Sequence, residues 1–119
     1  MNKKKQNTGS EGEDLACLHL QEKGYEIIEQ NYRFGHGEID IIAKDQNILV
    51  FVEVKTRNNL NFGMPETTIT QNKRKQIRKI ASAYLYEKEI KDIDCRIDVV
   101  AILLNKNEKP YINHIKNAF

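Results

Sequence analysis

Two neighbouring apolar stretches place the strongest limit on how this chain can fold. They cover residues 38–44 and 48–56, and the turn-forming residues Asp45-Gln46-Asn47 separate them. Stretches of this length joined by a short polar turn are typical of a β-hairpin. We therefore expect two antiparallel strands over these residues, and every other element has to pack around them.

Further helices and strands are expected on both sides of this hairpin. The expected elements are, in order, a helix over about 10–23, strands over 25–32, 38–44 and 48–56, a helix over about 71–89, and strands over 95–104 and 111–115. This order predicts an α/β fold with a mixed central sheet flanked by helices. One domain over residues 10–119 suits the chain length, after a disordered basic tail over residues 1–9.

Side chains at the expected helix ends carry the signals for where the helices begin and stop. Ser10 followed by Glu13 matches a capping box at the start of the first helix, and Gly24 fits its end. Thr70 fits the N-cap of the second helix. The second helix then repeats apolar residues at the spacing of one buried helix face.

The composition favours a cytoplasmic protein without a membrane span. The longest apolar runs are of strand length and too short to cross a bilayer. Cys17 and Cys95 match no zinc-binding spacing and each lies in an apolar stretch, so we expect both to be core residues in a reducing compartment. The net charge of +2 gives no global argument for nucleic acid, so only local clusters of basic residues can carry one.

Charged residues inside the apolar hairpin strands are the main candidates for chemistry. Glu53 and Lys55 share a strand face because they are two residues apart. Counting back from the turn brings Asp40 near the level of one of them. Such charges are costly in an apolar sheet unless they form ion pairs or bind metal. The alternatives are a buried ion pair of Lys55 with an acid, or a Mg²⁺ site on the two carboxylates.

The metal-site alternative predicts hydrolysis of phosphodiester bonds. Asp40 and Glu53 would hold Mg²⁺ or Mn²⁺, with the backbone carbonyl of Val54 as a further candidate ligand. The ion would polarise the phosphate and lower the pKa of a bound water. Lys55 would orient this water and stabilise the developing negative charge, so Asp40, Glu53 and Lys55 are the candidate catalytic residues.

The two motifs that hold these residues resemble a known nuclease signature. Residues 37–43 (GEIDIIA) and 51–57 (FVEVKTR) are similar to the PD-(D/E)xK motif, with Ile39 in place of its proline. The chain most resembles the YraN family of small bacterial proteins, and archaeal-type Holliday-junction resolvases more distantly. This resemblance implies a restriction-endonuclease-like αβββαβ core, DNA as the partner, and a homodimer. It also implies Glu13 as an added metal ligand, and the capping box is an equally good account of this residue.

Basic residues after the hairpin are candidates for contacts with nucleic acid. Arg57 lies two residues beyond Lys55 on the same strand face and could hold a phosphate. The second helix carries a basic cluster whose members are Lys73, Arg74, Lys75, Arg78 and Lys79. These could contact a phosphate backbone, or could simply form a solvated helix face. The resemblance places Lys73 near the active site.

Three functions are consistent with this sequence. The first is a Mg²⁺- or Mn²⁺-dependent nuclease that acts on DNA, with branched or damaged structures as candidate substrates. The second is a nucleic-acid-binding protein that keeps the nuclease fold without cutting, or cuts only with a protein partner. The third is a structural protein with a buried pair between Lys55 and a carboxylate.

Overall fold

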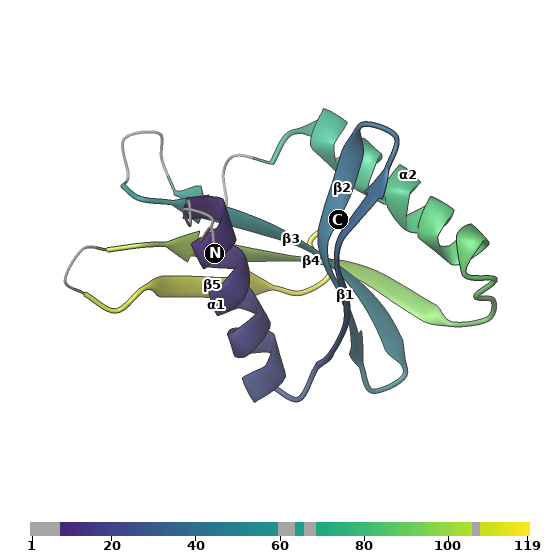
Figure 1. Cartoon of the computed structure of the whole chain (residues 1–119), viewed down its shortest axis with the longest axis horizontal. Helices are drawn as coiled ribbons and strands as arrows, with labels where there is room; N and C mark the ends of the chain where they lie inside the picture. Colours follow the sequence, from purple (N-terminus) through teal and green to yellow (C-terminus); the bar gives the residue numbers. More distant parts are fainter. Residues whose placement is uncertain (1–7, 60–63, 66–68, 106–107) are drawn as a thin grey trace, which may run out of the picture.

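The structure, a computed structural model, describes residues 8–59, 64–65, 69–105 and 108–119 (Figure 1). Its elements are α1 (Thr8–Glu22), β1 (Glu26–Phe34), β2 (Gly37–Asp45), β3 (Ile48–Arg57), α2 (Gln71–Glu87), β4 (Asp94–Leu103) and β5 (Tyr111–Ile115). This order confirms the predicted α/β fold with a mixed sheet. The predicted tail over residues 1–9 lies mostly outside the described residues, and α1 begins at Thr8, inside that range.

The sheet has the strand order β1-β2-β3-β4-β5. β2 and β3 form the predicted antiparallel hairpin, and β1 pairs antiparallel with β2. β4 runs parallel to β3 and antiparallel to β5. Parallel neighbours need a crossover connection, and α2 supplies it between β3 and β4. The first turn of α2 lies over the middle of β3, where Lys73 Nζ lies 3.5 Å from Glu53 Oε2.

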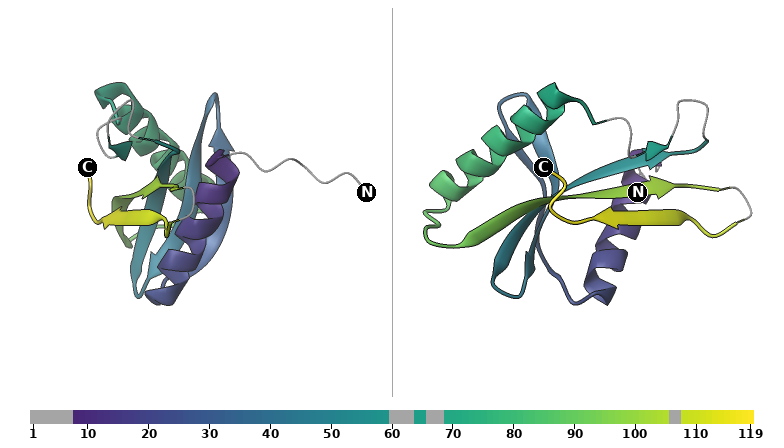
Figure 2. Two further views of the ribbon diagram at one scale, coloured as in Figure 1. Left: turned by 90° about the vertical axis from the view of Figure 1, so that its left-hand side faces the viewer. Right: turned by 180° about the vertical axis from the view of Figure 1, so that it is seen from behind.

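The two helices cover opposite faces of the sheet (Figure 2). On β3, Val50 and Val52 pack into the core under α1, and Leu49 and Phe51 pack into the core under α2. Because side chains alternate along a strand, Glu53 continues the α2 face of β3. The charged positions of β3 are thus aimed toward the side that α2 covers.

The beginning of α1 differs from its prediction, whereas its end agrees. Ser10 lies inside the helix and is not its N-cap, because α1 begins at Thr8; the predicted capping box is wrong. Gly24 ends the helix as predicted, with a φ of +92°, and the Tyr25 N–H donates to the Leu20 carbonyl at 3.0 Å. A serine is tolerated in the first turn as well as before it, so its type alone could not locate the start.

The predicted N-cap of α2 is confirmed. The Thr70 hydroxyl accepts a hydrogen bond from the Lys73 N–H at 3.1 Å.

The two cysteines differ in burial. Cys17 is buried as predicted, but Cys95 is exposed, so the prediction that Cys95 lies in the core is wrong. The physical reason is that α2 packs on β2 and β1 and leaves the start of β4 uncovered. No helix in the described part of the chain is long and apolar enough to cross a membrane.

A buried polar network around Asp98 links β4 to β5 and to the residues that follow β5. Asp98 is fully buried and accepts hydrogen bonds from Arg96 Nε at 2.9 Å and from the Asn117 N–H at 3.0 Å. His114 Nε2 lies 2.7 Å from the same carboxylate. Burial alone would raise the pKa of Asp98, but these hydrogen bonds outweigh burial and hold the pKa below its usual value. This network is therefore stabilising at neutral pH.

Asp98→Asn should lower the free energy of unfolding at pH 7 by roughly 3–5 kcal/mol, because it removes the fully buried partner of an ion pair and leaves Arg96 only the half-buried Asp45. The measurement is urea unfolding followed by circular dichroism. Asp94→Asn, at the exposed start of the same strand, is the matched control and should change stability by less than about 0.5 kcal/mol. Equal, small effects of the two substitutions would contradict the assigned role of the network.

Candidate metal centre

Strands β2 and β3 separate at Asp40. Their paired residues run from Asp45 opposite Ile48 to Ile41 opposite Val52. Ile39 and Ile41 pack into different cores although they are two residues apart, so β2 bends between them. Beyond the last pair the Asp40 carboxylate replaces a backbone partner, because its Oδ2 accepts a hydrogen bond from the Val54 N–H at 2.7 Å.

Asp40 and Glu53 face each other across this separation, and the charge of Glu53 disfavours the charge on Asp40. The sequence left open whether Asp40 lies level with Glu53 or with Lys55, and continuing the strand register places it level with Glu53. Burial and the charge of Glu53 raise the pKa of Asp40 to about 7. Burial also raises the pKa of Glu53, although nearby cations partly offset this effect. Two close, partly desolvated carboxylates are the arrangement that a divalent cation would stabilise.

The cation that pairs with Glu53 comes from helix α2. Lys73 Nζ lies 3.5 Å from Glu53 Oε2, and the Glu53 side chain is only 7% exposed. Lys55 is half-buried and close enough to lower the pKa of Glu53. It makes no ion pair within 4.0 Å with any residue that the structure describes. The alternative of a direct ion pair between Lys55 and an acid is therefore not seen, which leaves the Lys55 amine available.

Glu13 approaches the same acids from helix α1. Asn31 Nδ2 donates a hydrogen bond to Glu13 Oε1 at 3.0 Å, and Asn31 has a left-handed backbone with a φ of 54°. Burial raises the pKa of Glu13, the bond from Asn31 lowers it, and the charges of Asp40 and Glu38 raise it further. Glu13 thus lies within electrostatic range of the metal-site candidates.

Gly12 sets how closely α1 approaches the end of β3. Gly12 is not among the residues that the sequence predicted for the site. A Cβ atom at Gly12 would lie 1.9 Å from Oγ1 of Thr56, which no side chain could accommodate without displacement. Gly12 precedes Glu13, and Thr56 follows Lys55. The available signal was a glycine within a predicted helix, since glycine there costs roughly 0.5–1 kcal/mol relative to alanine and usually has a packing reason.

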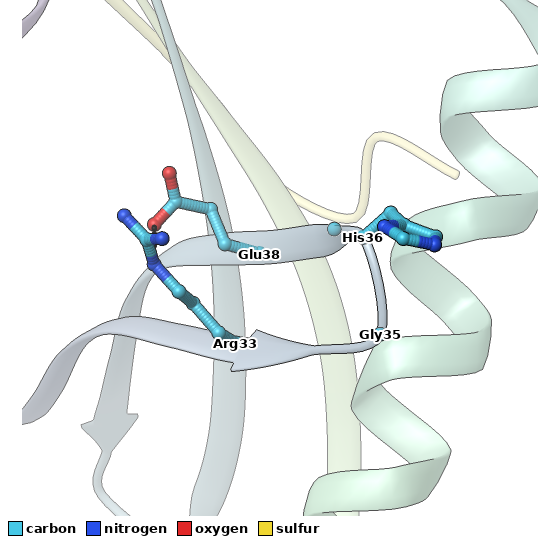
Figure 3. Close-up of a pocket in the computed structure, with 5 residues that line it drawn as sticks. Arg33, Gly35, His36 and Glu38 are labelled. Carbon is cyan, nitrogen blue, oxygen red and sulfur yellow. Dashed lines mark ion pairs between the residues drawn. The ribbon is translucent and has the colours of Figure 1, made fainter.

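Glu38 lies beside this acidic group, at the tip of the β1–β2 hairpin. Figure 3 shows Arg33 and Glu38 turned toward each other, with Arg33 Nε 3.8 Å from Glu38 Oε2. They line a pocket of about 340 Å³ together with the turn residues. His36 points away from this pair and is exposed.

The donor groups at the separation of the strands fit Mg²⁺. The described residues include no three His, Cys, Asp or Glu side chains that are close enough to hold an ion by themselves. Mg²⁺, however, commonly takes one or two carboxylates and completes its octahedron with waters and phosphate oxygens. The Val54 N–H and C=O point to the same side of the strand, so its carbonyl faces Asp40 as well. Asp40, Glu53 and the Val54 carbonyl are therefore the candidate ligands at the strand separation, and Glu13 is a candidate from α1.

The structure divides the predicted nucleic-acid-binding residues between two places. Lys73 reaches Glu53 at the site, and Arg57 ends β3 beyond Lys55. Arg74 and Arg78 instead lie over the ring of Phe119, with their Cζ atoms 5.2 Å and 5.9 Å from its centroid. Lys75, like Lys79, is exposed to solvent.

Comparison with known proteins gives one consistent result. The family model described as uncharacterised protein family UPF0102 matches residues 12–102, a range that includes all the metal-site candidates. A UPF0102 protein of Geobacter sulfurreducens is 46% identical over 111 residues, which cover 93% of this chain and 87% of the relative. One of Caldicellulosiruptor saccharolyticus is 45% identical over 116 residues, covering 97% and 98% of the two chains.

Asp40→Asn should raise the melting temperature of the metal-free protein at pH 8. The pKa of Asp40 is raised from 3.8 to about 7, so its destabilising charge is absent at low pH and fully present above the raised pKa. The stability gain should therefore grow as the pH rises through this interval. Asparagine keeps an oxygen that can accept the Val54 N–H.

The measurement is thermal unfolding in EDTA between pH 4 and pH 8. Asp92→Asn is the control, because Asp92 is exposed and its left-handed backbone, with a φ of 57°, also suits asparagine. A loss of stability in Asp40→Asn at pH 8 would contradict the assigned carboxylate repulsion.

Gly12→Ala should lower the free energy of unfolding by about 1–3 kcal/mol, because a methyl group at this position overlaps Thr56. Helix propensity alone predicts the opposite sign, with a gain of up to about 1 kcal/mol. Gly9→Ala, at an exposed position of α1, should show only that neutral or favourable effect. Chemical unfolding of both variants separates the two causes, and a stabilised Gly12→Ala would refute the close contact.

Proposed function

The chain belongs to the uncharacterised protein family UPF0102, the YraN-like family that its sequence resembled, and we propose that it is a divalent-metal-dependent nuclease. The observation that carries the proposal is the pair of Asp40 and Glu53 at the separation of β2 and β3. Both pKa values are raised there, and two lysines from different elements lie beside the pair.

The sequence resemblance and the element order support the same proposal. The motifs that resemble PD-(D/E)xK lie on β2 and β3, and the strand register brings Asp40 level with Glu53. The order α1-β1-β2-β3-α2-β4 agrees with the αβββαβ core that the resemblance implies. Because a fold hosts many functions, the proposal depends on the residues of the site more than on the fold.

Each residue has a defined task in the proposed reaction. Asp40, Glu53 and the Val54 carbonyl would hold Mg²⁺ or Mn²⁺, and Glu13 would support them from α1. When bound, the ion would supply Lewis-acid activation of the phosphate and of a water molecule. Lys55 orients that water and stabilises negative charge that develops on the phosphate. Lys73 partly neutralises the charge of Glu53 when no metal ion is bound.

DNA is the proposed substrate, and the proposed setting is the cytoplasm. Arg57 at the end of β3 and the basic residues of α2 would bind phosphates on either side of the cleaved bond. Phosphate contacts of this kind carry no sequence information, so we propose a nuclease that recognises the shape of its substrate.

Purified protein should cleave DNA only when Mg²⁺ or Mn²⁺ is present. The screen should include linear duplex, single-stranded, flap and four-way DNA, each with and without EDTA. Asp40→Asn, Glu53→Gln and Lys55→Ala should each lower the rate by about 100-fold or more, because each removes a group that stabilises the transition state. Lys44→Ala, near the opposite end of the same hairpin, should retain the full rate.

Two other outcomes would decide against this function. Calorimetry that detects no binding of Mg²⁺ or Mn²⁺ would exclude the metal site. Metal binding without any product, together with DNA binding that persists in EDTA, would favour the non-cleaving nucleic-acid-binding protein.

A further inference from the structure

Helix α2 carries an excess of positive charge that the fold leaves largely uncompensated. Its basic residues are Lys73, Arg74, Lys75, Arg78 and Lys79, and Glu87 is its only acidic residue. Lys73 pairs with Glu53, whereas the other four make no ion pair with any residue in the described part of the chain. Two of them, Arg74 and Arg78, lie one helical turn apart and therefore on one side of α2.

The last residues of the described chain place an aromatic ring against these arginines. The Asn117 N–H donates to Asp98 Oδ1 at 3.0 Å, and the Ala118 N–H donates to the Ile97 carbonyl at 2.7 Å. Both bonds hold this segment along β4, and the C-terminus lies beside α2 in both views of Figure 2. Phe119, which is half-buried, thereby reaches the guanidinium groups of Arg74 and Arg78.

A hollow of about 340 Å³ lies beside the Phe119 ring. Its lining includes Phe51, Ala81, Leu85, Ile97, Arg78 and Phe119. The volume falls in the range of small-molecule pockets. An apolar hollow bordered by an aromatic ring and guanidinium groups fits a ligand that is both flat and anionic.

We propose that this hollow binds an unpaired base of a single-stranded nucleic-acid segment, with Arg74 and Arg78 on the adjoining phosphates. Proteins that bind single strands combine a basic surface with aromatic rings on which bases stack. A duplex buries the faces of its bases in its own stack, so it could use the arginines but not the ring.

The position of the hollow relative to the candidate metal centre indicates which class of substrate would reach both. Lys73 at Glu53 and Arg78 at the hollow are five residues apart on α2, which is about 7.5 Å along the helix axis. A strand bound at Asp40 and Glu53 would therefore pass along the same helix. This inference rests on the proposed nuclease function and deepens it: the substrate has an unpaired segment beside the cleaved bond, as in a flap, a branch or a single-stranded end.

Phe119 could instead serve only to cover apolar side chains. In that case its replacement would change stability without any preference among nucleic acids. Comparing a single strand with a duplex of the same sequence distinguishes the two roles, because only the single strand offers an exposed base.

The chain contains no tryptophan, so Phe119→Trp introduces a single fluorescent reporter that can still stack. The full-length variant is titrated in EDTA, where the proposed cleavage does not occur, with a single-stranded oligonucleotide and with a blunt duplex. We expect saturable quenching of the fluorescence by the single strand and little quenching by the duplex. An unquenched signal at saturating single strand would overturn the proposal.

Phe119→Leu keeps an apolar residue but removes the aromatic ring. It should weaken single-strand binding about tenfold, within the measured range for base stacking, and leave duplex binding almost unchanged. Tyr86→Leu is the matched control, because Tyr86 is an 87% exposed aromatic residue of the same helix outside the hollow. Equal effects of Phe119→Leu on both nucleic acids, or no effect on either, would refute the proposal.

A third measurement uses the unmodified protein. Cys95 is exposed and lines the hollow, whereas Cys17 is buried. Saturating single strand should slow alkylation of Cys95 severalfold, and the duplex should not; equal rates would count against the site. Cleavage with Mg²⁺ is assayed separately: quenching without cleavage would refute the nuclease, and cleavage without quenching would refute this binding site.

Discussion

The hydrogen bond from the Val54 N–H to the Asp40 carboxylate is the interaction on which the site depends. It forms where β2 leaves β3, so it satisfies a backbone donor that the sheet no longer pairs. It also holds Asp40 level with Glu53 while β2 bends away. The separation of the strands admits charged groups from both helices, because Glu13 arrives from α1 and Lys73 from α2.

Two aspartates in this sheet have opposite pKa shifts, because their side chains have different surroundings. Asp98 is surrounded by donors, and its pKa is lowered, so its charge stabilises the fold. Asp40 faces another carboxylate, and its pKa is raised, so its charge costs stability in the metal-free protein. A protein that keeps an uncompensated charge of this kind usually does so where it is needed for binding or chemistry.

A single helix, α2, contributes residues both to the candidate metal centre and to the hollow beside Phe119. Lys73 in the first turn reaches Glu53, and Arg78, five residues further along, borders the hollow beside Phe119. Their spacing in the sequence suggested one basic cluster, but in the folded chain the basic residues of α2 lie at two different places. A helix that crosses over a sheet can serve the proposed catalytic acids at its start and the proposed nucleic-acid strand along its length.

The sequence by itself determined the order of the elements and placed Asp40 near the level of Glu53 or Lys55, because strand alternation and a short hairpin turn are local rules. The strand register of the folded chain decided for Glu53. Only the tertiary structure decided the partners: Lys73 for Glu53, Asn31 for Glu13, and the contact of Gly12 with Thr56. These contacts join segments far apart in the chain. They depend on how each helix packs on the sheet, which residue types and spacings do not encode.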